Sequence, residues 1–244
     1  MLEVKNLTVK YDPSDKICAL ENIDFFINDG EKVAVIGANG AGKSTLLLTL
    51  SGVLTPSDGE IYIDNVKYGR KNIKELRRKT GMVFQNPDDQ IFMPTVFEDI
   101  AFGPRNFGEK EEIIERRTDE LLSRLDITHL KNRLTHKLSG GEKRLAALAG
   151  ILVMDPSVIL MDEPSSFLDP KARRRLIRIL EQLPQTMIIA THDLDMALDL
   201  CGRVILLKNG GVRTDSYAKE VLHNAEILDE CGLELPLSVP AKSR

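Results

Sequence analysis

Residues 37–44 read GANGAGKS, and this stretch decides the fold expected for the chain. It fits the pattern G-x-x-x-x-G-K-[S/T], with Lys43 and Ser44 at the last two positions. Glycines in such a loop let backbone N–H groups surround an anion, and the lysine can bridge phosphate oxygens. The segment Glu31–Ile36 predicts a strand before the loop, and Ser44–Leu50 predicts a buried helix after it. We therefore expect a phosphate-binding loop in an α/β domain.

Two carboxylates follow another apolar run of strand length. Val158–Met161 is followed directly by Asp162 and Glu163. Because ligands of open α/β sheets bind at the carboxyl ends of the strands, both acids should face the phosphates. We expect Asp162, together with Ser44, to hold the Mg²⁺ of Mg-ATP, and Glu163 to act as general base toward an attacking water.

Two neutral polar side chains are expected at the same sheet edge, because Gln85 ends the segment MVFQ and His192 ends TMIIATH. The amide oxygen of Gln85 can reach Mg²⁺ or the water, and the His192 ring can contact the γ-phosphate and orient Glu163. The expected catalytic residues are Lys43, Gln85, Glu163 and His192, and the expected Mg²⁺ ligands are Ser44, Gln85 and Asp162.

Residues 138–142, LSGGE, are not explained by a single nucleotide site. Ser139 and Glu142 have the spacing of a capping box at the start of another helix. A helix N-terminus also favours an anion, so a second copy could present this one to the γ-phosphate held by the first. The two roles are compatible, and the second predicts dimerisation around ATP.

The bulk properties exclude several classes. With 244 residues the chain can bury a full core, and its net charge of −4 gives no basic excess for nucleic acid. The three cysteines are Cys18, Cys201 and Cys231. Their number and spacing suggest neither a disulfide framework nor a zinc site, which fits a reducing cytoplasm. The apolar runs are of strand length, so the chain is not expected to span a membrane.

The first third of the sequence indicates short strands. Leu2–Val9 and Ile17–Ile27 alternate between apolar and polar residues around a turn-forming YDPSDK, which predicts antiparallel strands. Ile61–Ile63 and Met82–Phe84 predict two more, separated by the charged segment Arg70–Lys79.

The character of the sequence changes between Asn86 and Leu138, where strand signals vanish. Glu109–Leu125 has apolar residues at helical spacing among charges, which predicts an inserted helical subdomain. From Asp155 strands and helices alternate, as in a parallel sheet covered by helices. The predicted elements are Val158–Met161, Pro170–Leu183, Thr186–Ala190, Leu194–Leu200 and Arg203–Leu207, with an Asn209-Gly210 hairpin turn before Val212.

The predicted fold class is therefore α/β: a P-loop NTPase core with a mostly parallel sheet, an N-terminal antiparallel β subdomain and an inserted helical subdomain. We expect the ATP-binding core and the β subdomain within residues 1–85 and 155–215. Residues 86–154 are expected to form the helical subdomain that carries LSGGE, and residues 216–244 a short C-terminal helical tail.

In this order the motifs resemble those of the nucleotide-binding subunit of an ATP-binding cassette (ABC) transporter, over about residues 1 to 230. The resemblance implies that Tyr11 stacks on adenine, that Gln85 is the Q-loop glutamine, that Asp169 is the D-loop aspartate and that His192 is the switch histidine. It identifies Gly37–Thr45 as the Walker A loop, Leu138–Glu142 as the signature, and Asp162 and Glu163 as the Walker B acids. The residues expected to contact ATP are Tyr11, Gly37, Ala38, Asn39, Gly40, Ala41, Gly42, Lys43, Ser44, Thr45, Ser139, Gly140, Gly141 and Asp169.

A narrower resemblance rests on Val83–Gly108, VFQNPDDQIFMPTVFEDIAFGPRNFG, which is similar to the ATPases of energy-coupling factor (ECF) importers. It implies a groove that receives coupling helices of a membrane partner. The segments EPSSFLDPKARRRL, from Glu163, and ILDECGLELPLSV, from Ile227, favour the cobalt or nickel branch over the shared vitamin modules. Phe167 and Glu142 depart from the residues common at their positions in the family.

These features predict an ATPase that pairs with a second copy or a paralogous subunit, with a homodimer favoured. It would act at the cytoplasmic face of the cell membrane, as a peripheral subunit, with an integral membrane coupling protein and a substrate-capturing membrane protein. The alternatives are an ECF importer ATPase for a vitamin, a soluble ABC ATPase that clamps nucleic acid or assembles a cofactor, and a metabolic kinase. LSGGE has no use in a kinase, and neither a coiled-coil insertion nor a basic excess supports a nucleic-acid clamp.

Overall fold

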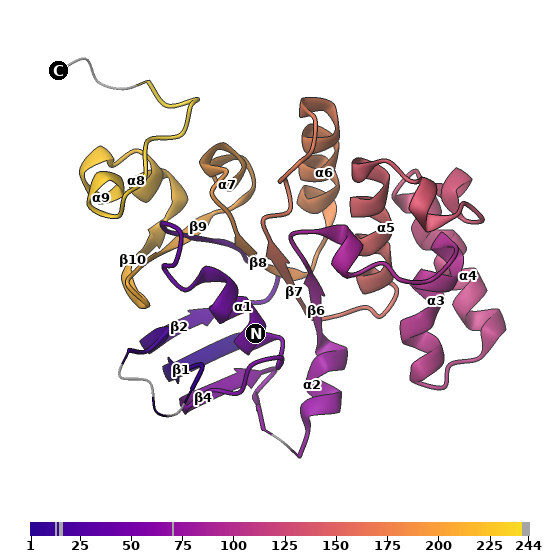
Figure 1. Ribbon diagram of the computed structural model, residues 1–244, viewed down its shortest axis with the longest axis horizontal. Coiled ribbons are helices and arrows are strands. Elements are labelled where there is room, and N and C mark those ends of the chain that lie inside the picture. The colour runs from indigo at the N-terminus through magenta and orange to yellow at the C-terminus, as the bar shows by residue number, and fades with distance from the viewer. Residues whose placement is uncertain (13, 15–16, 70, 241–244) are drawn as a thin grey trace.

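A computed structural model describes residues 1–12, 14, 17–69 and 71–240, and it places two sheets on either side of helix α1 (Figure 1). The smaller sheet is antiparallel and has the strand order β2-β1-β4-β5. Its strands are β1 (Leu2–Val9), β2 (Leu20–Ile27), β4 (Asp58–Ile63) and β5 (Val66–Lys67). The larger sheet has six strands in the order β10-β9-β3-β8-β7-β6.

The larger sheet positions the ends of its strands along one edge. Strands β6 to β9 and β3 pair in parallel, and only β10 runs antiparallel, to β9. The central strands are almost wholly buried, as expected for apolar runs in a parallel sheet covered on both faces. The strands are β3 (Lys32–Ile36), β6 (Thr80–Val83), β7 (Val158–Asp162), β8 (Thr186–Ala190), β9 (Arg203–Lys208) and β10 (Gly211–Tyr217).

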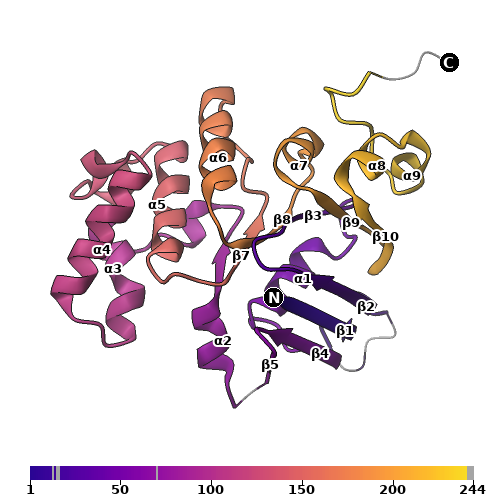
Figure 2. The ribbon, with the colours of Figure 1, turned by 180° about the vertical axis from the view of Figure 1, so that it is seen from behind.

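Each central strand contributes to two cores, because alternate side chains point to opposite faces. In β3, Val33 and Val35 pack with α1 and the antiparallel sheet, whereas Ala34 and Ile36 pack with helices on the other face. Figure 2 shows α6 and α7 on that other face. The sheet is therefore a rigid layer between two apolar clusters.

The helices occupy different parts of the molecule (Figure 1). α1 (Lys43–Leu50) lies between the sheets, and α2 (Ile73–Lys79) precedes β6. α3 (Val96–Asn106), α4 (Glu111–Arg124) and α5 (Gly140–Leu152) form one side of the molecule. α6 (Pro170–Gln182) and α7 (Leu194–Leu200) cover the large sheet, and α8 (Ala218–Leu222) and α9 (Ala225–Glu230) lie at the opposite end. Short 3₁₀ turns occur at Pro87–Asp89, Thr128–Leu130 and Thr135–Lys137.

The fold class predicted from the sequence is confirmed, while several boundaries differ. The second strand begins at Leu20 and not at Ile17, whose side chain is 84% exposed and makes no core contact. Part of the turn expected between these strands, and residues 241–244 of the expected tail, lie outside the described residues. The charged segment Arg70–Lys79 contains helix α2, and α3 was not predicted. No helix in the described part of the chain is long and apolar enough to cross a bilayer.

Candidate functional site

The loop from β3 to α1 has a backbone that only glycine accommodates at two points. Gly37 has φ 153°, and a Cβ there would lie 2.5 Å from the carbonyl oxygen of Leu207. Gly42 has φ 107°, and a Cβ there would lie 2.6 Å from Leu20 Cδ2. Because L-residues with a side chain avoid this region of φ, the motif glycines are needed for the loop to close over the sheet. The loop thus brings its backbone and Lys43 to the start of α1.

The side chain of Lys43 is held over this loop by carbonyl oxygens of the loop backbone. Its Nζ donates hydrogen bonds to the carbonyl oxygens of Gly37, at 2.7 Å, and Ala38, at 3.2 Å. An ammonium group that is buried to this extent needs such partners, and a phosphate could compete for the same donors. The first turn of α1 lies beneath it and favours an anion at the same point.

A cavity of about 720 Å³ opens above the loop, at the carboxyl ends of β3, β6, β7 and β8. Its size suits a ligand as large as a nucleotide. Thirteen of the residues predicted for the nucleotide site line it, namely Tyr11, Gly37, Ala38, Asn39, Gly40, Gly42, Lys43, Ser44, Thr45, Gln85, Asp162, Glu163 and His192. Ala41, which is also expected to contact ATP, is buried and does not line the cavity, so its contact with ATP stays a prediction.

Glu163 and His192 meet directly in this cavity. His192 Nδ1 lies 2.7 Å from Glu163 Oε2, and the His192 amide donates to the same oxygen at 3.1 Å. The hydroxyl of Thr191 donates to it as well, at 3.2 Å. Glu163 has φ 46°, one residue past β7, and its amide donates to Ala190 O at 2.8 Å. This turn aims a nearly buried carboxylate at the cavity, while the His192 side chain is 66% exposed.

Asp162 lies at the end of β7, within hydrogen-bonding distance of Ser44. The pKa of the Asp162 carboxyl lies above its usual range, mainly because burial disfavours the charged form. The charge of Glu163 raises this pKa further, whereas the hydrogen bond from Ser44 and the charge of Lys43 lower it. A buried carboxylate beside a half-buried one favours a nearby cation. A hydroxyl and a carboxylate are hard oxygen ligands, and the Gln85 amide lines the same cavity, so the donor set fits Mg²⁺.

Tyr11 stands at the rim of the cavity. Its hydroxyl is 2.8 Å from Thr45 Oγ1, and its side chain is 66% exposed, so the ring has a free face. We expect Tyr11→Ala to raise the KM for ATP about 5- to 150-fold, because stacking on a base contributes about 1–3 kcal/mol by alanine substitution. Tyr11→Phe loses only the Thr45 contact and should stay within about twofold of wild type. Equal KM values for Tyr11→Ala and wild type would contradict stacking by Tyr11.

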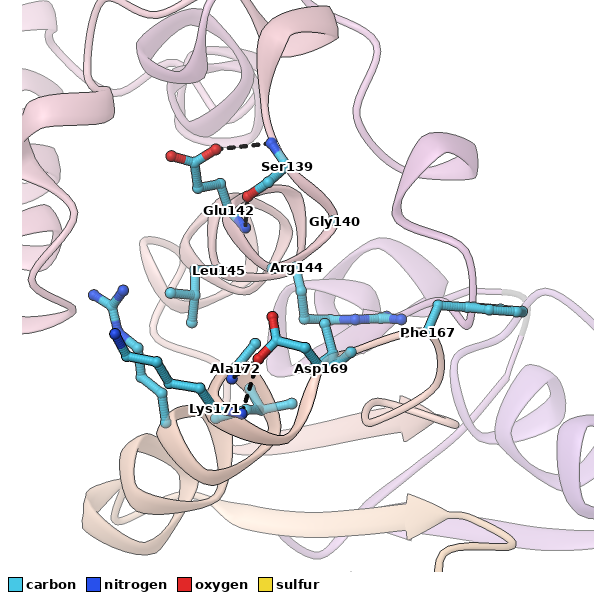
Figure 3. A pocket seen from close by; sticks show the side chains of 13 residues that line it. Ser139, Gly140, Glu142, Arg144, Leu145, Phe167, Asp169, Lys171 and Ala172 are labelled. Carbon is cyan, nitrogen blue, oxygen red and sulfur yellow. Dashed lines mark hydrogen bonds between the residues drawn. The ribbon is translucent and has the colours of Figure 1, made fainter.

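Ser139, Gly140, Gly141 and Asp169 line a different cavity, of about 350 Å³ (Figure 3). It shares no lining residue with the first. Ser139 caps α5 through a capping box, because its Oγ accepts from the Glu142 amide and its own amide donates to Glu142 Oε2 at 2.7 Å. Asp169 caps α6 by accepting from the amides of Lys171 and Ala172. The capping role predicted for LSGGE is thereby confirmed.

Several residues of the site carry no motif and were not predicted. Gly232 and Leu233, just beyond α9, line the same cavity as the phosphate-binding loop, as does Ala19. Arg144 of α5 is buried, and its guanidinium donates to the carbonyls of Phe84 and Gln85. It thereby links the helix that begins at LSGGE to the segment that carries Gln85. Only its place six residues after Leu138 could have drawn attention to it.

Comparison with known proteins agrees with this geometry. A family described as "ABC transporter" matches residues 20–166. The energy-coupling factor transporter ATP-binding protein EcfA of Methanothermobacter thermautotrophicus is 42% identical, over 100% of this chain and 79% of its own. The structure of cbiO1 from Clostridium perfringens, part of the ABC transporter complex cbiONQ, superposes with a TM-score of 0.83 at 41% identity, covering 94% of this chain and 93% of that one. The cassette MJ0796, solved as a dimer in a post-hydrolysis state with ADP and Pi, has a TM-score of 0.79 at 31% identity, covering 89% and 99%.

A phosphate-binding loop and two acids at one sheet edge, with an LSGGE helix on an inserted subdomain, define an ATP-binding cassette. This chain belongs to the ABC transporter family. It is an ATPase subunit, and its relatives include EcfA proteins of energy-coupling factor transporters.

Proposed function

We propose that this chain is the ATPase of an ECF-type importer that drives uptake of a cobalt or nickel ion. It would act as a peripheral subunit at the cytoplasmic face of the membrane, with an integral coupling protein and a substrate-capturing membrane protein. The similarity to EcfA and to cbiO1 supports this proposal, as does the stretch Val83–Gly108. Nothing in its charge suggests nucleic acid as a partner.

The dimer is supported by the separation of the two cavities. One contains the phosphate-binding loop and Glu163, the other contains Ser139 and Asp169, and no residue lines both. Two copies related by a twofold axis would bring each signature helix to the ATP held by its partner. Every motif is intact in this chain, which favours a homodimer with two active sites.

In the proposed reaction the residues act on a water and on the γ-phosphate. The two hydrogen bonds and the His192 ring contact described at Glu163 all meet Oε2, which leaves Oε1 to accept a proton from the attacking water. Lys43 would hold the β- and γ-phosphates, and Gln85 would orient the water. Ser44, Asp162 and Gln85 would hold Mg²⁺, which neutralises charge on the phosphates when bound. The exposed His192 ring can reach the γ-phosphate while its Nδ1 stays near Glu163.

One observation supports coupling to a membrane partner most directly: aromatic rings are exposed around α3. Phe92, Phe102 and Phe107 are exposed, and the rings of Phe92 and Phe102 meet edge to face at 4.7 Å. Clustered aromatic rings are unfavourable when exposed to water, and they are typical of a surface that binds an apolar helix of a partner. They lie in the stretch that resembles ECF ATPases. ATP-driven closure would move this face and so the partner.

Affinity capture from native membranes tests the proposal. We would load tagged Glu163→Gln protein with ATP in mildly solubilised membranes and identify its partners by mass spectrometry. We expect a multi-span coupling protein together with a small membrane protein that binds cobalt or nickel. A captured protein that binds a vitamin would change the cargo, and recovery of only soluble proteins or nucleic acid would refute transport.

A matched control for the capture experiment changes two of the exposed phenylalanines around α3. Phe92→Asp/Phe102→Asp in the same background should lose the membrane partner while binding ATP normally, because both side chains are exposed and neither lines the nucleotide cavity. Retention of the partner by this variant would place the coupling surface elsewhere.

A further inference from the structure

Asp193 joins three elements beside the proposed catalytic pair. It follows His192 directly, and its Oδ1 caps α7 by accepting from the Met196 amide at 2.9 Å. Ser165, in the loop after Glu163, also donates to its carboxylate. The Asp193 amide donates to Thr191 Oγ1 at 3.0 Å. The short segment from Thr191 to Asp193 is thus fixed at both ends.

The strongest partner of Asp193 comes from α6. Arg173 Nε donates to Oδ2 at 2.6 Å, and Nη2 donates to Oδ1 at 2.8 Å. Such a two-point contact fixes orientation as well as distance. Both side chains are largely shielded, with exposures of 25% and 20%. Burial alone would raise the pKa of the Asp193 carboxyl, but the hydrogen bonds from Arg173, Met196 and Ser165 outweigh it and lower the pKa.

The contacts continue from this pair to the proposed base. Thr191, which accepts from the Asp193 amide, donates to Glu163 Oε2, and the amide and ring of His192 reach the same oxygen. Arg173 itself does not line the nucleotide cavity. It lies in the first turns of α6, directly after the N-cap Asp169, which is the proposed D-loop aspartate.

We propose that Arg173 is a positioning residue: its two-point contact with Asp193 holds the segment that carries His192 in register with Glu163, and links that register to the D-loop. The inference rests on the roles proposed above for Glu163 and His192. Loss of the contact would free the His192 segment without removing a group that touches ATP. The turnover number should therefore change while ATP affinity does not.

ATP turnover of Arg173→Met tests this inference. Methionine keeps most of the side chain volume and removes both donors. We expect kcat to fall about 10-fold, with KM for ATP within about twofold, because small displacements of reacting groups reduce rates strongly. Arg173→Lys, which can make one contact, should recover part of the loss. Arg178→Met is the matched control, since Arg178 is exposed on the same helix, and should behave as wild type.

A double-variant comparison separates positioning from general stabilisation. In a His192→Ala background, Arg173→Met should lower kcat less than twofold, because its effect passes through His192. An undiminished 10-fold loss in that background, or a rise in KM alone, would overturn the proposal. If His192→Ala itself left turnover unchanged, the role proposed for His192 would fail instead.

Asp193→Asn tests the same contact in case the Arg173→Met protein does not fold. It can keep Oδ1 as the cap of α7, while an amide NH₂ would face Arg173 Nε where Oδ2 accepts now. We expect the same fall in kcat, with a thermal midpoint that still shows a folded protein. Wild-type turnover by a folded Asp193→Asn protein would also overturn the proposal.

Discussion

Replacing Glu163 by glutamine should lower ATP turnover roughly 10²- to 10⁴-fold, the range expected when a general base is lost. Glutamine has nearly the same shape and can still accept from the His192 amide, but it cannot take a proton from water. ATP binding should persist, because Lys43 and the loop are untouched. The variant should therefore accumulate as an ATP-bound dimer, measurable by size-exclusion chromatography with and without ATP.

Glu181→Gln provides the control, because it makes the same chemical change at an exposed position of α6. It should hydrolyse ATP at the wild-type rate and form no stable dimer with ATP. If Glu163→Gln instead hydrolysed ATP normally, Glu163 could not be the base, and the His192 contact at 2.7 Å would need another explanation.

Two inactive variants should restore activity to each other when mixed. Lys43→Met removes the cation from one cavity, whereas Gly140→Asp puts a negative charge into the other. Each alone should lose at least about 100-fold in turnover, since each removes electrostatic stabilisation of the phosphate. In an equal mixture with random pairing, half of the dimers are mixed and have one intact site of two. Turnover should recover to about a quarter of wild type.

Gly140→Asp suits this test because the subunit that carries the substitution has room for the new side chain. No heavy atom lies within 4 Å of a Cβ added at Gly140, and an acid in the first turn of α5 favours the helix. A loss of activity would then report on the partner's phosphate and not on misfolding. If the mixture stayed as inactive as its components, ATP would not be shared between two chains, and the proposed dimer would be wrong.

The sequence predicted those parts of the site whose residues are neighbours in the chain. The phosphate-binding loop needs glycines at Gly37 and Gly42 for steric reasons, and those reasons leave a readable pattern. The acids after β7 are preceded by an apolar run, and a buried parallel strand requires one. Their position at the carboxyl edge follows from topology. The roles of these residues stay predictions.

Other parts could not be predicted because local signals conflict with the fold. α3 contains Gly103 and Pro104, which oppose a helix, but the capping box of Thr95 and Glu98 and the buried Ile100 stabilise it. The hairpin between β4 and β5 turns at Asp64-Asn65, both with positive φ, without the usual glycine. Contacts such as Arg173 to Asp193 depend on tertiary packing and leave no local pattern at all.

The cavity wall formed by Gly232 and Leu233 has a consequence for biosynthesis. Tyr11 and Ala19, from the opposite end of the chain, line the same cavity. A chain emerging from the ribosome would have its phosphate-binding loop early, yet the pocket around it would be finished only when the last helices had docked. Because a ligand that binds only the finished pocket favours the folded state by mass action, ATP would stabilise completed chains but not partial ones.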